Sequence, residues 1–201
     1  MKEEKFESIL DSAKKLFGQY SFKKTSLDEI ARKARVAKAT IYNYFGSKDY
    51  VYMEVLRRET DKIIEKIIHS INKESLPPDK LRAFIRAKFR YMSETINVLN
   101  LDRTGIDEIL PSVQNIRNSF FEREVDIVRD ILNEGVEKGF FHLNDVFVAA
   151  KAICHSLRRF ELDWLIQETE DKIEKYLDEL ITILFYGILS KRVKAQVDSV
   201  K

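Results

Sequence analysis

Apolar residues recur every three or four positions through most of the chain, a spacing typical of amphipathic helices. The spacing predicts a first helix from about Glu3 to Gln19 and a third over residues 38–45. Between them, Ser26 and Glu29 have the separation of a capping box, which predicts a short second helix. Only residues 35–38 separate that helix from the third. Two short helices joined by so tight a turn predict a helix-turn-helix, and the first helix completes its core.

The rest of the chain predicts longer helices. Ser47 is expected to cap one that runs to about Ile71, and residues 72–79, which include Pro77 and Pro78, form the clearest break. Asn144 is expected to cap a later helix. The remaining expected segments are a helix from 81 to before 100, a short piece over 102–109 before Pro111, and helices over 113–136, 147–165 and 170–191. Only 6 Gly and 3 Pro in 201 residues agree with few turns and long helices.

The predicted fold class is therefore all-α. We expect an N-terminal three-helix helix-turn-helix domain at residues 1–48, which binds DNA. A bridging helix would join it to a helical-bundle body at residues 49–201, which binds an effector and forms a dimer.

Charge is distributed unevenly. Residues 1–50 hold 11 Lys and Arg against 7 Asp and Glu, whereas the remainder holds 24 against 26. A mildly basic N-terminal domain suits a nucleic-acid partner. The single cysteine, Cys154, allows no internal disulfide, and no signal peptide or membrane-spanning apolar run is present, so we expect a cytoplasmic protein without a membrane partner.

The third helix has an unusual polar face. Ile41 and Phe45 fall on one apolar side, while the opposite arc carries small, hydroxyl and amide side chains with Tyr42 at its boundary. That arc consists of Ala39, Thr40, Asn43 and Tyr44, and Lys38 stands at the start of the helix. These side-chain types meet base edges and phosphate oxygens, so the helix is expected to enter a DNA groove.

The segments Thr25–Ala31, Ala34–Phe45 and Ser47–Lys48 resemble the DNA-binding domain of TetR-family transcriptional regulators. The resemblance covers about the first quarter of the chain. It implies a homodimer, in most members a repressor, that binds a palindromic double-stranded operator and is released by a small-molecule effector.

The same resemblance assigns roles to single residues. Tyr42 and Tyr44 correspond to tyrosines that contact phosphate and thymine, and Lys48 corresponds to a phosphate clamp at a helix N-terminus. The full set of expected DNA contacts is Thr25, Ser26, Arg35, Lys38, Ala39, Thr40, Tyr42, Asn43, Tyr44 and Lys48.

Three positions depart from the family pattern. Arg35 occupies the usual position of a turn glycine, where a positive φ would cost about 1 kcal/mol and the added cation could reach a phosphate. Ala37 replaces the usual serine cap, at a cost of about 1 kcal/mol. Ala39 replaces a glycine that lets the backbone approach DNA, so the docking of this helix is expected to be slightly altered.

The body holds many aromatic residues, most of which are expected to pack in its core. An effector pocket between helices would be lined by such residues and a few polar groups. The candidates are Phe89, Phe121, His155, Arg159 and Trp164. Arg158 is a further polar candidate; alternatively, it pairs with Glu161, and Arg159 pairs with Asp163, on a solvated helix face.

The last helix is apolar around more of its circumference than one buried stripe requires. Two ordinary core helices would explain part of this pattern. A four-helix bundle across a two-fold axis would use the second stripe. The expected dimerisation residues are Leu157, Leu177, Leu180, Ile181, Leu184 and Ile188.

The sequence gives little support for a catalytic function. His69, His142 and His155 have no metal-ligand spacing, and neither a phosphate-binding glycine loop nor a nucleophile elbow is present, so we expect no enzyme activity, no metal and no cofactor. Two alternatives stay open. A helical protein-interaction module would keep its activity after Tyr42 and Lys48 are replaced, and an all-α enzyme would turn over the ligand of the body.

Overall fold

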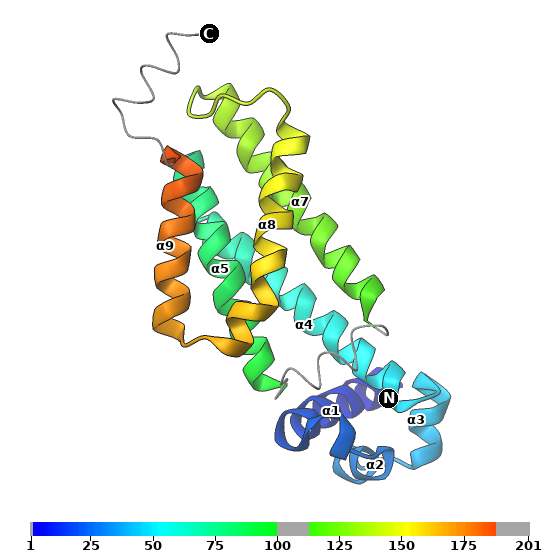
Figure 1. Cartoon of the computed structure of the whole chain (residues 1–201). Helices are drawn as coiled ribbons and strands as arrows, with labels where there is room; N and C mark the ends of the chain where they lie inside the picture. The colour runs from blue at the N-terminus through cyan, green and yellow to red at the C-terminus, as the bar shows by residue number, and fades with distance from the viewer. Residues whose placement is uncertain (1, 100–112, 188–201) are drawn as a thin grey trace, which may run out of the picture. The chain divides into compact units, whose positions relative to one another are not determined.

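The computed structural model describes residues 2–99 and 113–187, and every regular element in these ranges is an α-helix (Figure 1). The predicted all-α fold class is thus confirmed. The helices are α1 (Lys2–Lys24), α2 (Leu27–Ala34), α3 (Lys38–Phe45), α4 (Lys48–Ile71), α5 (Pro77–Val98), α7 (Gln114–Glu137), α8 (Val146–Gln167) and α9 (Glu170–Tyr186).

The local signals at the start of α2 act as the sequence predicts. The Ser26 hydroxyl accepts a hydrogen bond from the Glu29 amide at 3.3 Å, and the Glu29 carboxylate accepts one from the Ser26 amide at 2.7 Å. Two amide groups that the first helical turn would leave unpaired are thereby satisfied. These hydrogen bonds also hold the pKa of the Glu29 carboxyl below its usual value.

The turn between α2 and α3 shows the consequences expected from two of the three departures from the family pattern. Arg35 ends α2 in the left-handed conformation, with φ at 55°, and Ala37 precedes α3 without any side-chain cap. Ser47 caps α4 by accepting a hydrogen bond from the Tyr50 amide, as expected.

The N-terminal domain has a core made from one face of each of its helices. Ile41 of α3 is fully buried there, and Tyr52 of α4 packs its ring edge-on against Phe17 and Phe22, with each pair of ring centroids 4.9 Å apart. The other fully buried apolar residues of this core are Ile9, Ala13, Ile30 and Val51. Burial of Ile41 fixes which face of α3 stays outside.

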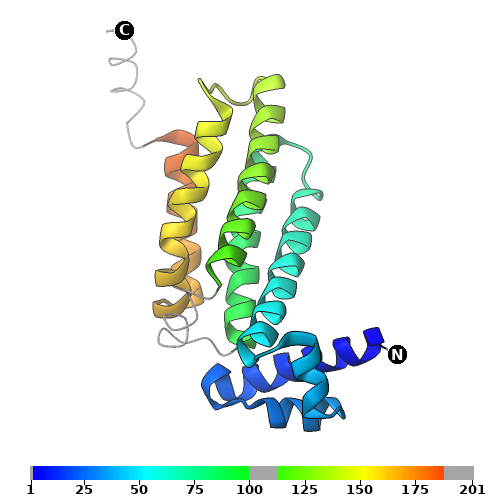
Figure 2. The ribbon, with the colours of Figure 1, turned by 90° about the vertical axis from the view of Figure 1, so that its right-hand side faces the viewer.

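Helix α4 continues from this core into the body, where it contacts α5 and α7; Figures 1 and 2 show α4 and α5 side by side. Leu99 and Val113, which flank the undescribed 100–112 segment, are buried in the core of the N-terminal domain, with Ile116 of α7 packed against it. Parts of the body are therefore built into the domain that carries α3.

Several predicted details differ. Asp145, not Asn144, caps α8: it directly precedes the first helical residue, Val146, and its carboxylate accepts a hydrogen bond from the Val148 amide at 3.0 Å. Helix α1 reaches Lys24 across a non-helical Ser21, beyond the expected end at Gln19. The expected piece over 102–109 and Pro111 lie outside the described residues.

The chain divides into two compact units, Met1–Ile166 and Gln167–Lys201. The second unit contains α9, which ends at Tyr186 with Gly187 in a left-handed conformation at its C-cap, so the described part of the helix is shorter than the expected 170–191. The functional boundary between residues 48 and 49 stays a prediction.

The Arg35 turn generates a test. We expect Arg35→Gly to be more stable than Arg35→Ala by about 1 kcal/mol, because only glycine adopts a φ of 55° without a Cβ penalty. Denaturant unfolding of both variants measures the difference, and the loss of the guanidinium cancels between them. An alanine variant as stable as the glycine variant would show that the turn carries no strain.

Candidate nucleic-acid interface

The outer face of α3 is exposed because Ile41 anchors its inner face. Lys38, Ala39, Tyr42 and Asn43 are exposed, and 49% of the Tyr42 surface is accessible to solvent. Thr40 is half-buried beside them. The face therefore presents an amide, a phenol, an ammonium group and a small residue that allows close approach, which together suit contact with base edges and phosphates.

Lys38 is held in place by a contact that DNA can replace. Its ammonium group donates to the Asp28 carboxylate at 2.8 Å, and both side chains are exposed. This hydrogen bond holds the pKa of Lys38 above its usual value, so the side chain stays charged. Since an exposed ion pair contributes little stability, exchanging Asp28 for a phosphate costs little.

Tyr44 lies at the edge of this face and is turned toward α1. Its hydroxyl donates to the Lys2 carbonyl at 3.0 Å, and its ring packs edge-on against Phe6 with the centroids 5.8 Å apart. The side chain thus helps to attach α3 to the start of α1. A direct contact of Tyr44 with DNA stays a prediction.

Three predicted contact residues instead build the corner where α1, α2 and α4 meet. Thr25 is buried and its hydroxyl donates to the Ser21 and Leu16 carbonyls. Ser26 is used in the capping box. Lys48 donates to the carbonyls of Phe22 and Thr25 at 3.0 and 3.1 Å. Direct DNA contacts of these three side chains stay predictions.

Two exposed residues flank the α3 face. Arg35 is exposed in its left-handed turn, beside the start of α3. Tyr50, in the first turn of α4, is 61% exposed, and the sequence analysis did not select it. Its position three residues after the Ser47 cap, near a helix N-terminus that favours anions, is the signal that could have identified it.

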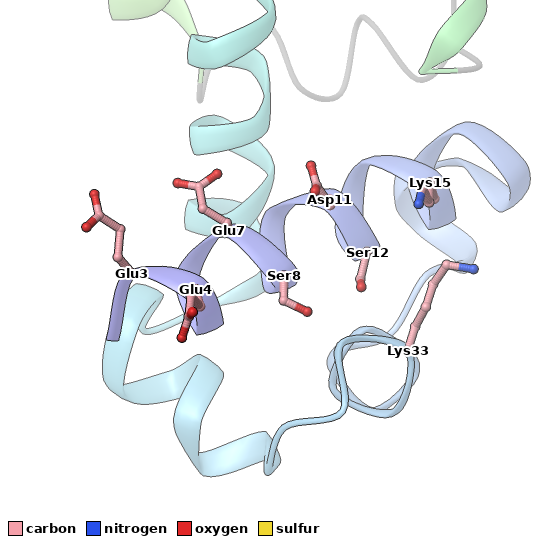
Figure 3. A pocket seen from close by; sticks show the side chains of 8 residues that line it. All are labelled: Glu3, Glu4, Glu7, Ser8, Asp11, Ser12, Lys15 and Lys33. Carbon is pink, nitrogen blue, oxygen red and sulfur yellow. The ribbon is translucent and has the colours of Figure 1, made fainter. Parts of the chain in front are cut away.

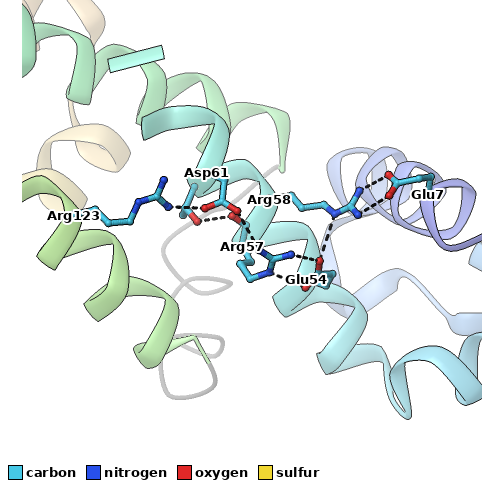
Figure 4. Close-up of polar contacts among 7 residues, drawn as sticks. Glu7, Glu54, Arg57, Arg58, Asp61 and Arg123 are labelled. Carbon is cyan, nitrogen blue, oxygen red and sulfur yellow. Dashed lines mark hydrogen bonds and ion pairs between the residues drawn. The ribbon is translucent and has the colours of Figure 1, made fainter. Parts of the chain in front are cut away.

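A series of ion pairs connects α7, α4 and α1 (Figure 4). Arg123 of α7 donates to the Asp61 carboxylate of α4 at 2.5 Å. The same carboxylate accepts a hydrogen bond from Arg57, one helical turn nearer the N-terminal domain, at 3.1 Å. Helices α7 and α4 are therefore joined through one shared carboxylate.

The series of ion pairs continues along α4 to α1. Glu54 accepts hydrogen bonds from Arg57 at 2.6 and 2.9 Å and lies 3.4 Å from Arg58. Arg58 in turn makes a two-pronged pair with Glu7 of α1 (Figure 4). Its guanidinium group also lies over the Phe6 ring. The hydrogen bond to Arg58 holds the pKa of Glu7 below its usual value. These ion pairs, which we call the α7–α4–α1 ion-pair chain, link the body to the N-terminal domain.

The surface also has a hollow of about 840 Å³ along α1 (Figure 3). Four carboxylates line it together with two serines and two lysines: Glu3, Glu4, Glu7, Asp11, Ser8, Ser12, Lys15 and Lys33. An excess of carboxylates repels phosphate, so this hollow does not suit DNA.

The structure brings two of the five effector candidates together. The rings of Phe121 and His155 lie 4.6 Å apart, and Arg158 lies over the Phe121 ring at 5.1 Å while donating to Asn118. Phe121 and Phe89 are buried, whereas His155 and Arg159 are exposed. The side chains of Trp164 and of Glu161 and Asp163, the suggested partners of Arg158 and Arg159, lie outside the described residues. The effector set stays a prediction.

The expected dimerisation residues differ in exposure. Leu157, Leu177 and Ile181 are buried, Leu180 is half-buried and Leu184 is 40% exposed. Ile188 lies outside the described residues. Their part in a dimer stays a prediction.

The described part of the chain contains neither a helix suited to span a membrane nor a cluster of metal-binding side chains. Across residues 2–99 and 113–187, no helix has the length and apolar character that crossing a membrane requires. Within the same ranges, no group of three or more His, Cys, Asp or Glu side chains is placed to hold a metal ion.

Comparison with known proteins gives a family match for the N-terminal domain. The family model described as "Bacterial regulatory proteins, tetR family" matches residues 9–55, which span the domain that carries α3. Residues 9–55 therefore match the DNA-binding domain of the TetR family of bacterial transcriptional regulators.

Similar proteins extend the likeness over the body. The fatty acid metabolism regulator protein of Bacillus subtilis is 21% identical over 191 residues, which cover 94% of this chain and 98% of that protein. A crystal structure of FadR from Bacillus subtilis in complex with stearoyl-CoA aligns with a TM-score of 0.68 and 20% identity, over 92% of this chain and all of that one. A transcriptional regulator from Cytophaga hutchinsonii aligns with a TM-score of 0.74 and 22% identity, over 89% and 95%.

The different surroundings of Lys48 and Lys38 generate a test. Lys48→Met removes donors from two backbone carbonyls, so we expect it to lower the free energy of unfolding by about 1–2 kcal/mol. The matched control, Lys38→Met, removes only an exposed ion pair and should change it by less than about 0.5 kcal/mol. Equal losses in denaturant unfolding of the DNA-free protein would contradict the structural role of Lys48.

Proposed function

We propose that this chain is a homodimeric regulator, most simply a repressor, that binds a palindromic operator through α3 and leaves it when an effector binds the body. The exposed polar face of α3, fixed by the burial of Ile41, is the observation that carries the proposal. In a dimer, two copies of this face would meet half-sites about one helical turn of DNA apart.

Release would be mechanical. Helix α4 belongs to the core of the N-terminal domain at Tyr52 and Val55 and packs in the body with α5 and α7. A shift of the body helices therefore moves the domain that holds α3, and the distance between the two α3 helices of the dimer would no longer match the operator. The effector must bind the released geometry more tightly than the DNA-bound one, because otherwise it would shift nothing.

The class of effector follows from the body and from the similar proteins together. The buried part of the body is rich in phenylalanine, with Phe84, Phe89, Phe120 and Phe121 all buried, which suits an apolar ligand. One relative is named a fatty acid metabolism regulator, and one similar structure holds stearoyl-CoA. We propose a fatty acyl compound as the effector.

Selection of genomic DNA fragments by the purified protein tests the DNA-binding part of the proposal. We expect enrichment of a two-fold symmetric site that binds one dimer, and an affinity that falls steeply as salt rises because phosphate contacts release counterions. Enrichment of no symmetric site would contradict it, and the protein-interaction alternative would then lead.

A pair of variants then locates the interface. Tyr42→Ala should weaken binding to the selected site by about tenfold or more, since a base or phosphate contact is worth about 1–3 kcal/mol. Tyr20→Ala is the matched control, because Tyr20 is 45% exposed but lies on α1. Both variants should keep the unfolding temperature of the wild type. Equal weakening by both, or by neither, in fluorescence anisotropy titrations would exclude α3 as the specific contact.

A further inference from the structure

The body contains a buried ion pair that the DNA interface does not use. Lys88 of α5 donates to the carboxylate of Glu124 of α7, and these side chains are only 1% and 2% exposed. The other buried polar or charged side chains of the described chain, Ser12, Thr25 and Glu59, lie on α1, α4 or the corner between α1 and α2. Among the described residues, Lys88 and Glu124 are thus the charged side chains that are buried between α5 and α7.

This pair is a poor way to stabilise two helices. Removing two charges from water costs several kcal/mol each, and their attraction often does no more than offset that cost, so apolar residues of the same volume would serve equally well. A surface alternative already exists, because Lys80 and Glu134 join the same two helices at 2.6 Å while both are partly exposed. A buried charge that stability does not need is a candidate for ligand binding.

The surroundings of the pair favour an apolar acid. The Lys88 ammonium group lies 5.4 Å from the centre of the Phe120 ring, and Phe84, Ile85 and Phe89 of the same helix are buried. The thiol of Cys154 on α8 lies in the field of the pair, and burial first, then the Glu124 carboxylate, raises its pKa to about 12. The Lys88 cation beside buried aromatic and aliphatic groups suits a carboxylate at the end of an apolar chain.

The neighbouring surface supports the same sign of charge. Arg158 of α8 lies over the ring of Phe121, the residue next to Phe120, and the centre of the exposed His155 ring lies 4.6 Å from the centre of the Phe121 ring. Arg158 thus adds a positive charge beside Phe121, which favours an anion over a cation.

We propose that Lys88 binds the carboxylate of an apolar monocarboxylic acid, and that Glu124 occupies the place of that carboxylate when the body is empty. The long, flexible stem of lysine lets its ammonium group follow a new anion. The displaced Glu124 side chain must then move or take up a proton, because a buried carboxylate without a cation is costly. This inference rests on the proposed effector-binding body and narrows its ligand to a free acid.

The proposal also explains how binding would reach the DNA. Arg123 precedes Glu124 on α7 and is the body end of the α7–α4–α1 ion-pair chain. Separating Glu124 from Lys88 shifts the turn of α7 that holds Arg123, and with it the shared Asp61 carboxylate of α4.

Binding of three dodecyl probes to the full-length protein tests the proposal: dodecanoate, its methyl ester and dodecanoyl-CoA. The readouts are calorimetric affinity and the shift of the unfolding temperature, so neither needs an operator. We expect dodecanoate to bind the wild type at least about tenfold more tightly than the uncharged ester, since a charge-assisted contact is worth about that factor or more.

The variant Lys88→Met/Glu124→Gln removes both charges without leaving either one buried alone, and should lose the preference for the acid over the ester. Lys80→Met/Glu134→Gln breaks the surface pair between the same helices and should keep it. Lys88→Arg, which retains the cation, should keep most of it and reports on the site if the double variant does not fold.

Each other outcome overturns the proposal. Equal binding of acid and ester, or an acid preference that survives the loss of Lys88, excludes Lys88 as the anchor. Tighter binding of dodecanoyl-CoA with no effect of the double variant leaves the proposed acyl effector intact but assigns its anion elsewhere. If no probe binds while the operator is still selected, the acid site fails and the DNA-binding part of the proposed function stands.

Discussion

One helix is built into two cores, and the rest of the structure depends on that constraint. The first turns of α4 complete the N-terminal core through Tyr52 and Val55, and its later turns bury Ile63, Ile64 and Ile67. A helix of 24 residues is about 36 Å long and transmits displacement along its axis. Because close-packed cores resist gradual deformation, a change in the body reaches the DNA-binding domain as movement of a rigid element.

Ion pairs add further contacts between α4 and its neighbouring helices. Glu59 of α4, largely buried, accepts hydrogen bonds from Lys14 of α1 and from Lys62, so α1 is tied to α4 at a second place besides Glu7 and Arg58. Apart from Glu59, the side chains in these ion pairs are partly exposed, where an ion pair contributes little stability. These ion pairs instead fix geometry, because carboxylates shared between arginines hold α7, α4 and α1 in one relative position. A different relative position of the three helices would require several ion pairs to exchange partners.

The features that depend on neighbours in sequence could be predicted, and those that depend on distant partners could not. The Ser26–Glu29 capping box lies within one turn of chain and was predicted from its residues. The cost of a positive φ at Arg35 and the missing cap at Ala37 were expected from the family resemblance, as departures from its glycine and serine. The exposed arc of α3 follows from helical spacing around Ile41. The prediction of Asn144 as the cap was wrong because Asn144 and Asp145 are both capable caps, and only the backbone decides between adjacent residues.

The missed contacts join residues far apart in the chain. Lys48 was interpreted as a phosphate clamp, yet its donors also meet carbonyls 23 and 26 residues earlier. Lys88 and Glu124 are 36 residues apart, and the residues around Lys88 in the sequence do not indicate this partner. A single sequence gives helical faces, but which faces meet, and therefore which charges are buried together, is decided by packing.

Hydrogen exchange with and without operator DNA tests the connection most directly, because coupling between two sites is reciprocal and needs no knowledge of the effector. If α4 joins the two cores as described, operator binding at α3 should slow amide exchange in the second half of α4 and around Arg123 in α7. Tyr42→Ala at the same DNA concentration should abolish both effects. Slower exchange confined to residues before Val55, with α7 unchanged at saturating operator, would contradict the account.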